Sequence, residues 1–184
     1  MKVKYILRTL ILLSISSCYT SEYSVSDESK HFEIDFTIEQ NENMEGILTF
    51  DIKLDSGYYF VSPHSQGIHQ RLIFSIENTD NILLNGNLIE HPTSLEEFDQ
   101  LSEKKGKFVR ENTVYKQKLT IKSGNDFDVS GLIWLEIRPN CQPYEISFII
   151  SNKSGKLKVE NSKLIASGYP TFWDMKRIDT LQNN

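Results

Sequence analysis

The sequence predicts an all-β protein built as a two-sheet antiparallel sandwich. Short stretches of alternating apolar and polar residues recur along the chain, and turns rich in Gly, Asn, Ser and Asp separate them. Aromatic residues make up 11% of the chain, which favours strands. Before residue 168 no stretch has the period of a helix, and 184 residues suffice for one domain with a full core.

The first residues form an export signal. The basic residues Lys2, Lys4 and Arg8 precede a short apolar run that begins at residues 10–13 and is far below the ~20 residues that span a bilayer. The run ends in Ile-Ser-Ser-Cys at Cys18, which resembles a bacterial lipobox. The resemblance implies cleavage before Cys18 and a diacylglycerol anchor on its sulfur. An ordinary signal peptide with a chance cysteine is the alternative.

This interpretation divides the chain into four segments and places it in the cell envelope. Residues 1–17 are the signal peptide, 18–30 a solvated tether, 31–167 the sandwich and 168–184 a tail. Loss of the three basic residues changes the formal charge from -5 to -5 - 3 = -8. A chain this acidic has no electrostatic support for a nucleic-acid partner. The lipid anchor must therefore provide the attachment to the membrane, on the periplasmic face or the cell surface.

The first strands are predicted from apolar residues that alternate with polar ones. Residues 31–39 and 46–54 show this pattern on either side of a polar turn, and we expect them to form a hairpin. An aromatic strand is predicted over residues 57–63, where an irregular segment begins. A further strand is predicted over residues 71–77.

The middle of the chain contains weaker signals. Residues 82–91 are predicted to form two short strands around Asn85-Gly86, a dipeptide suited to a tight hairpin turn. Residues 92–107 are highly charged, and we expect a loop with a helical turn from Ser94, because the following Glu97 fits a capping box.

The last third of the chain is predicted to form two hairpins and a final strand. Residues 107–111 and 114–122 are expected to pair with each other around Asn112. Residues 131–150 contain two alternating arms on either side of a turn with proline and cysteine, which predicts a second hairpin. The final strand is expected over residues 156–160. The tail that follows contains Tyr169, Phe172 and Trp173 and is expected to dock on the sandwich.

Three stretches, in their order and spacing, resemble a known family. They are Gly-Tyr-Tyr-Phe-Val-Ser at 57–62, Glu-Phe-Asp at 97–99 followed by the strand at 114–119, and Cys-Gln-Pro at 141–143 followed by an alternating strand. They resemble the N-terminal domain of the DsbD family of periplasmic thiol–disulfide interchange proteins, over about residues 30–151. The resemblance implies an immunoglobulin-like sandwich that takes part in thiol–disulfide interchange or binds a thioredoxin-like redox partner.

The sequence departs from this family at the reactive site. Cys141 corresponds to the second cysteine of the family's pair, but Leu135 or Glu136 stands where the first is expected. Two thiols are needed, because one attacks a disulfide and the other resolves the mixed disulfide. We therefore expect no autonomous dithiol catalysis. The resemblance makes Cys141 the candidate redox residue, Pro143 the residue that shapes its turn, and Phe98 the aromatic residue that shields the thiol.

Each of these assignments has an alternative in which the residue has only a structural role. Cys141 would instead be a small buried apolar residue, and Phe98 a loop residue packed on the core. The whole domain would then be a non-catalytic binding or assembly module of the envelope. If Cys18 carries lipid, Cys141 is the only remaining thiol and cannot form a bridge within the chain.

No other constellation in the sequence supports a catalytic or cofactor site. His64 and His69 lie five residues apart without a cysteine or carboxylate at ligand spacing, so a zinc site has little support. The sequence contains no Gly-x-Ser-x-Gly elbow and no glycine-rich phosphate-binding motif. We therefore expect neither a metal ion nor an organic cofactor.

Overall fold

A computed structural model describes residues 30–166, except 42, 69, 77–79 and 101–102, and this part of the chain is all-β. It contains no helix, and hence no helix that could cross a membrane. The predicted signal peptide with Cys18, the tether up to residue 29 and the tail at 168–184 lie outside the described residues.

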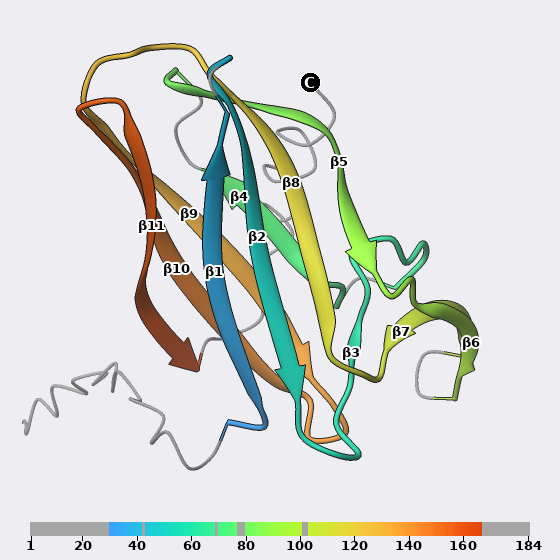
Figure 1. Ribbon diagram of the computed structural model, residues 1–184. Helices are drawn as coiled ribbons and strands as arrows, with labels where there is room; N and C mark the ends of the chain where they lie inside the picture. Colours follow the sequence, from blue (N-terminus) through green and yellow to red (C-terminus); the bar gives the residue numbers. More distant parts are fainter. Residues whose placement is uncertain (1–29, 42, 69, 77–79, 101–102, 167–184) are drawn as a thin grey trace, which may run out of the picture.

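Two four-stranded antiparallel sheets face each other as the two layers of a sandwich (Figure 1). The front sheet has the order β1 (Phe32–Gln40), β2 (Glu45–Leu54), β8 (Thr113–Ile121) and β5 (Ile82–His91). The rear sheet has the order β11 (Lys156–Ala166), β10 (Gln142–Lys153), β9 (Phe127–Ile137) and β4 (Ile73–Ile76). The predicted antiparallel β-sandwich is confirmed.

The core lies between the sheets and is rich in aromatic rings. Phe50 on β2 stacks on Tyr115 of β8 with ring centroids 4.9 Å apart, and on Phe74 of β4 at 5.7 Å. Phe74 in turn stacks on Phe148 of β10 at 6.0 Å. The alternation of apolar and polar residues in the sequence directs these rings inward, and the resulting row connects the front sheet to the rear sheet.

Gly131 on β9 is required by close packing. It lies opposite Phe148 in the β9–β10 register, and the Phe148 ring covers its Cα. A Cβ atom at Gly131 would lie 2.1 Å from Phe148 Cζ, well inside the distance at which carbon atoms repel. The glycine thus allows a phenylalanine to fill the core at a point where the sheet comes close.

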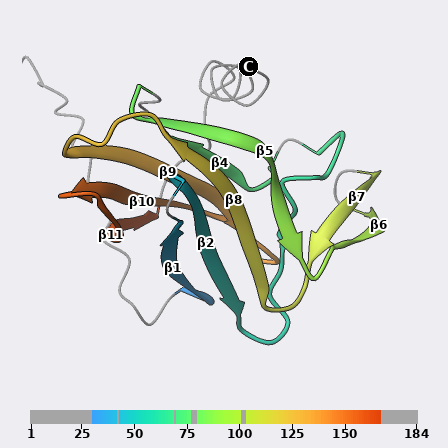
Figure 2. The same ribbon diagram turned by 45° about the horizontal axis from the view of Figure 1, so that its top comes forward.

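A third, smaller sheet lies at one side of the sandwich (Figures 1 and 2). Its strand order is β3 (Phe60–Val61), β7 (Lys104–Val109) and β6 (Leu95–Asp99). The predicted loop with a helical turn at residues 92–107 is wrong, because β6 and β7 form a hairpin there. The three carboxylates of β6 face a strand with three lysines, and opposite charges across a hairpin stabilise it.

Residues 82–91 form one strand, and the predicted hairpin turn at Asn85-Gly86 is wrong. β5 pairs with β8 along its length, with a register shift between Asn85 and Ile89. Gly86 has a φ of 68° within this bulge, so the dipeptide serves an irregular strand instead of a turn. Gln117 of β8 donates hydrogen bonds to the carbonyl oxygens of Asn85 and Gly86 at 3.2 and 3.3 Å, which satisfies the displaced backbone.

The predicted pairing of residues 107–111 with 114–122 is also wrong. β7 belongs to the small sheet and β8 to the front sheet, so the chain crosses between sheets at residues 110–112. The Asn112 side chain accepts a hydrogen bond from the Leu54 amide at 3.0 Å and so attaches this crossing to the end of β2.

The predicted hairpin of residues 31–54 and the central hairpin are both confirmed. β1 pairs with β2, and β9 with β10, in continuous antiparallel registers. β11 extends to Ala166, beyond the predicted end at residue 160. β1 lies beside β11 at the edge of the sandwich, where the Leu157 amide donates to the Gln40 side-chain oxygen at 3.2 Å. The first and last strands of the sandwich are therefore neighbours.

Candidate functional site

The candidate site lies at the turn between β9 and β10, residues 138–141, at the lower end of the sandwich in Figure 1. The Arg138 amide donates to the Tyr59 carbonyl oxygen at 2.8 Å, and the Tyr59 amide donates to the Arg138 carbonyl oxygen at 3.1 Å. These two bonds attach the turn to the segment before β3. Cys141 closes the turn with a φ of 51°, a left-handed conformation that few residues other than glycine adopt.

Cys141 is half-buried at this turn and takes no part in a disulfide. Its Sγ lies 3.6 Å from the Pro139 carbonyl oxygen, to which the thiol donates a weak hydrogen bond. The neighbouring Pro139 and Asn140 are exposed. The cysteine is thus at the surface end of the hairpin and not among the fully buried residues of the core.

Three charged side chains are buried directly beside the turn. Arg138 Nε donates to Glu136 Oε1 at 3.0 Å, and Arg138 Nη1 donates to Asp99 Oδ2, also at 3.0 Å. Each of the three side chains is at most 6% exposed. We call Asp99, Glu136 and Arg138 the ion-pair cluster. It joins the end of β9 to the end of β6, two segments that are distant in sequence.

The cluster holds Arg138 in its charged form. Burial alone lowers the pKa of Arg138, but the hydrogen bonds and negative charges of Glu136 and Asp99 outweigh burial and raise it above its ordinary value. A buried ion pair is costly to break, because removal of one partner leaves an uncompensated charge away from water. The cluster therefore fixes the β6–β7 hairpin against the β9–β10 turn.

Glu136 and Leu135 occupy the positions where a second thiol would be expected. Both lie in β9 and pair with Pro143 and Tyr144, which lie two and three residues beyond Cys141. Both are buried, and Cys141 is the free cysteine in the part of the chain that the structure describes. The described residues therefore supply no second thiol with which Cys141 could form a disulfide.

Phe98 and Pro143 occupy different surroundings. Pro143 is buried in β10 opposite Glu136, so it belongs to the paired strand and not to the turn. Phe98 is 63% exposed on β6 and is not packed into the core. Its ring lines a hollow of about 290 Å³, and the lining does not include Cys141. The structure brings β6 to the turn through Asp99, the residue that follows Phe98.

Arg110 and Tyr59 complete the surface around this hollow. The Arg110 guanidinium lies 4.1 Å from the centroid of the Tyr59 ring and forms a bidentate ion pair with Glu97, at 2.9 and 3.1 Å. The Glu97 hydrogen bond is the main cause that raises the pKa of Arg110. The sequence analysis assigned no role to Arg110 and did not predict the ion pair between Asp99 and Arg138. The complementary charges of residues 95–99 and 104–110 were a signal for the β6–β7 hairpin and for the pairing of Arg110 with Glu97.

A third buried carboxylate, Glu90, has a structural role. It accepts hydrogen bonds from the Ser62 hydroxyl at 2.7 Å, the Tyr115 hydroxyl at 2.8 Å and the Ser94 amide at 2.7 Å. Burial raises the pKa of Glu90, but the hydrogen bonds together outweigh burial and lower it. Burial and the Glu90 charge hold the pKa of Tyr115 well above its ordinary value. The hydrogen bonds of Glu90 connect β5 to β8 and to the segment after β3.

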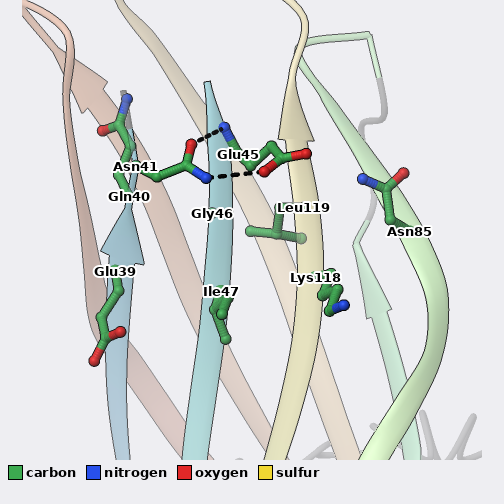
Figure 3. Close-up of a pocket in the computed structure, with 9 residues that line it drawn as sticks. All are labelled: Glu39, Gln40, Asn41, Glu45, Gly46, Ile47, Asn85, Lys118 and Leu119. Atoms are coloured by element: carbon green, nitrogen blue, oxygen red, sulfur yellow. Dashed lines mark hydrogen bonds between the residues drawn. The ribbon is translucent and has the colours of Figure 1, made fainter. Parts of the chain in front are cut away.

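A hollow of about 360 Å³ lies at the opposite end of the front sheet, and Figure 3 shows its lining. Asn41 accepts hydrogen bonds from the Asn43 and Glu45 amides, both at 3.0 Å, and donates to the Glu45 carboxylate at 2.8 Å. The Gln40 side-chain oxygen is engaged by the Leu157 amide. These polar groups stabilise the β1–β2 turn, so we assign the hollow to the turn and not to a ligand.

The histidines do not form a metal site in the part of the chain that the structure describes. No group of three His, Cys, Asp or Glu side chains lies close enough to hold a metal ion there. His31 stacks on Tyr58 with centroids 3.7 Å apart, and its Nδ1 lies 3.3 Å from Asp55. His64 is described, whereas His69 lies outside the described residues.

The fold and this site define an antiparallel β-sandwich whose described thiol lies at a hairpin turn beside buried charges and an aromatic hollow. No protein-family model matches the chain, and no curated protein sequence matches it.

Proposed function

We propose that the protein is a lipid-anchored binding module of the cell envelope, similar to the N-terminal domain of the DsbD family. It docks a thioredoxin-like partner at the β9–β10 turn and does not act as a dithiol reductase by itself. The observation that carries the proposal is the position of Cys141 at the exposed end of the hairpin, with the buried Glu136 where a second thiol is expected.

The covalent chemistry available to this site is a single exchange. The Cys141 thiolate attacks one sulfur of a partner disulfide, an S–S bond forms to that sulfur, and the other partner sulfur leaves as a thiolate. Release requires that displaced thiolate to attack back, because the part of the chain that the structure describes holds no second thiol to resolve the mixed disulfide. The protein would therefore hold or relay a partner without turnover of its own.

The surroundings of the thiol support docking of a protein. Tyr59, Phe98, Phe108 and Arg110 line the adjacent hollow, and aromatic residues and arginine are enriched at the centres of protein interfaces. The ion-pair cluster keeps this surface and the turn in one fixed arrangement, which reduces the entropy lost on binding.

The test measures whether a folded partner accelerates the reaction of Cys141. In the Cys18→Ser protein Cys141 is the only thiol, and it is offered a thioredoxin-like protein whose single active-site cysteine carries thionitrobenzoate. Attack by Cys141 forms the protein–protein disulfide and releases coloured thionitrobenzoate. A short peptide with the same modified cysteine measures the reactivity without docking.

We expect the folded partner to react at least about tenfold faster than the peptide, because docking raises the effective concentration of the thiol. Cys141→Ser should abolish the release in both cases. Equal rates for partner and peptide would refute docking at this turn. Reaction only in denaturant would leave the non-covalent binding module, which the sequence analysis kept open, as the better description.

A further inference from the structure

β6 is the strand whose free edge is least protected in the described part of the chain. It ends the small sheet, so one side pairs with β7 and no described strand pairs with the other. Free edges are hazardous because their unpaired backbone groups accept further strands, and proteins usually protect them with short length, charged side chains (lysine above all), proline, bulges or cover. β6, with the sequence Leu-Glu-Glu-Phe-Asp, has three carboxylates but no lysine, proline or bulge, and its register with β7 is unbroken.

The other edge strands are protected by a neighbouring strand, burial, a bulge or short length. β1 and β11 lie against each other, β4 consists of four buried residues, and β5 contains the bulge after Asn85. β3 has two residues and is bridged on its other side by Arg71. Leu95 and Phe98, by contrast, are 75% and 63% exposed, the highest values among the large apolar residues that the structure describes.

From this contrast we infer that the free edge of β6 binds an extended segment of a partner protein by strand addition, with basic and apolar residues alternating in that segment. Main-chain hydrogen bonds supply affinity in this mode, and pockets for alternate side chains supply specificity. Hollows of about 110 and 290 Å³ lie along β6, one lined by Leu95 and the other by Phe98. Phe108 and Arg110 line both hollows.

The acidic side chains of β6 favour a partner segment that contains basic residues. Glu97 and Asp99 form ion pairs with Arg110 and Arg138 at 2.9 and 3.0 Å. Glu96, whose side chain is 59% exposed, forms a longer ion pair with Lys105 at 3.7 Å and is the carboxylate most accessible to a partner. Strand alternation puts Glu96 and Phe98 on one face, two positions apart. A lysine or arginine opposite Glu96 and a β-branched or aromatic residue opposite Phe98 would therefore be favourable cross-strand neighbours.

The same charges disfavour a second copy of this chain as the occupant. Antiparallel pairing of β6 with itself would place carboxylates directly opposite carboxylates, an unfavourable arrangement, and the chain as a whole carries a formal charge of -5. The inference rests on the proposed function only in requiring a protein partner, and it does not involve Cys141.

The test uses the full-length protein and fluorescein-labelled peptides of seven residues, with fluorescence anisotropy as the measurement. The probe alternates lysine and valine. One control peptide replaces lysine by glutamate, and another keeps the side chains but has N-methyl groups on alternate backbone amides. Phe98→Lys places a protecting residue on the edge, and Leu83→Lys, at a 44% exposed apolar residue of β5, is the matched control variant.

We expect the lysine–valine peptide to bind, and the glutamate and N-methyl peptides to bind at least about tenfold more weakly, since each loses favourable charge or backbone hydrogen bonds. Phe98→Lys should weaken binding by a similar factor and Leu83→Lys should not. Glu96→Lys should reverse the preference in favour of the glutamate peptide, which keeps the test decisive if Phe98→Lys fails to fold.

Equal binding of the N-methyl peptide would overturn strand addition, and equal losses in Phe98→Lys and Leu83→Lys would overturn the assignment to β6. A dimer in sedimentation equilibrium that Phe98→Lys dissociates would show a second copy as the occupant and also overturn it. The Cys141→Ser protein separates the two proposals. Retained peptide binding there, together with no acceleration of thiol exchange in the parent, would leave the β6 site standing and reject the thiol-docking proposal.

Discussion

Substitution of Arg138 tests the role of the ion-pair cluster. Arg138→Met keeps an apolar stem of similar length but removes both hydrogen bonds, at 3.0 Å each, from Glu136 and Asp99. The two buried carboxylates would then lose the guanidinium that they share. Breaking a buried ion pair in this way costs about 3–5 kcal/mol. Domains of this kind are stable by only about 5–15 kcal/mol, so the variant should lose a large fraction of its free energy of unfolding.

Arg110→Met is the matched control, because the same substitution removes an ion pair at the surface. The Arg110 side chain is 50% exposed, and exposed pairs contribute about 0–1 kcal/mol. Its stacking on Tyr59 adds about 0.5–1 kcal/mol at an exposed site. Urea unfolding followed by circular dichroism at pH 7 measures both variants. Equal losses, or a loss below about 1 kcal/mol for Arg138→Met, would refute the structural role of the cluster.

The remaining predictions concern packing, acid stability and the anchor. Gly131→Ala should unfold the protein or cost several kcal/mol, on the order of 3, because its Cβ would overlap the Phe148 ring; a change below about 1 kcal/mol in urea unfolding would contradict this. The lowered pKa of Glu90 stabilises the fold above its unfolded pKa of about 4.3, and this contribution is lost as the pH falls through the folded value. Glu90→Gln should therefore be less stable than the parent at pH 7, and the difference should shrink as the pH is lowered below about 4.3; a difference that stays constant on acidification would exclude this cause. Cys18→Ser should release the protein from membranes in cell fractionation, and persistent membrane association would reject the lipobox interpretation.

The main hairpins could be predicted because one face of each strand is buried. Period-two alternation around residues 41–45 and 138–141 fixes both the strands and their register, since a slip by one residue would expose the apolar set. The prediction failed at residues 82–91 for a tertiary reason. Gln117, distant in sequence, satisfies the carbonyl groups of Asn85 and Gly86 and makes an irregular strand more favourable than a local turn.

The candidate site was predicted only in part. The turn with Cys141 is visible in the sequence as a break between two alternating arms. The ion-pair cluster is not visible there, because Asp99 and Arg138 are 39 residues apart and each reads as an ordinary surface charge. Residues 95–99 contain three charged residues in five positions, and such a stretch is expected to be a solvent-exposed loop. Pairing with arginines from two other segments is what allows that stretch to be a strand.

The adjacency of β1 and β11 sets the order in which this domain can become complete. The two sheets meet at β1 and β11, the strands of the sandwich that are synthesised first and last. The hydrogen bond between Leu157 and Gln40 joins residues 117 positions apart in the chain. Contacts of such separation close slowly, because the entropy of a long loop is lost before the contact contributes. A growing chain that has not reached residue 156 has no neighbour for β1 on that side. The domain can therefore be completed only after β11 has been synthesised. Truncation before β11 would free the edge of β10 that pairs with it and uncover β1, and both edges would be open to pairing with other chains.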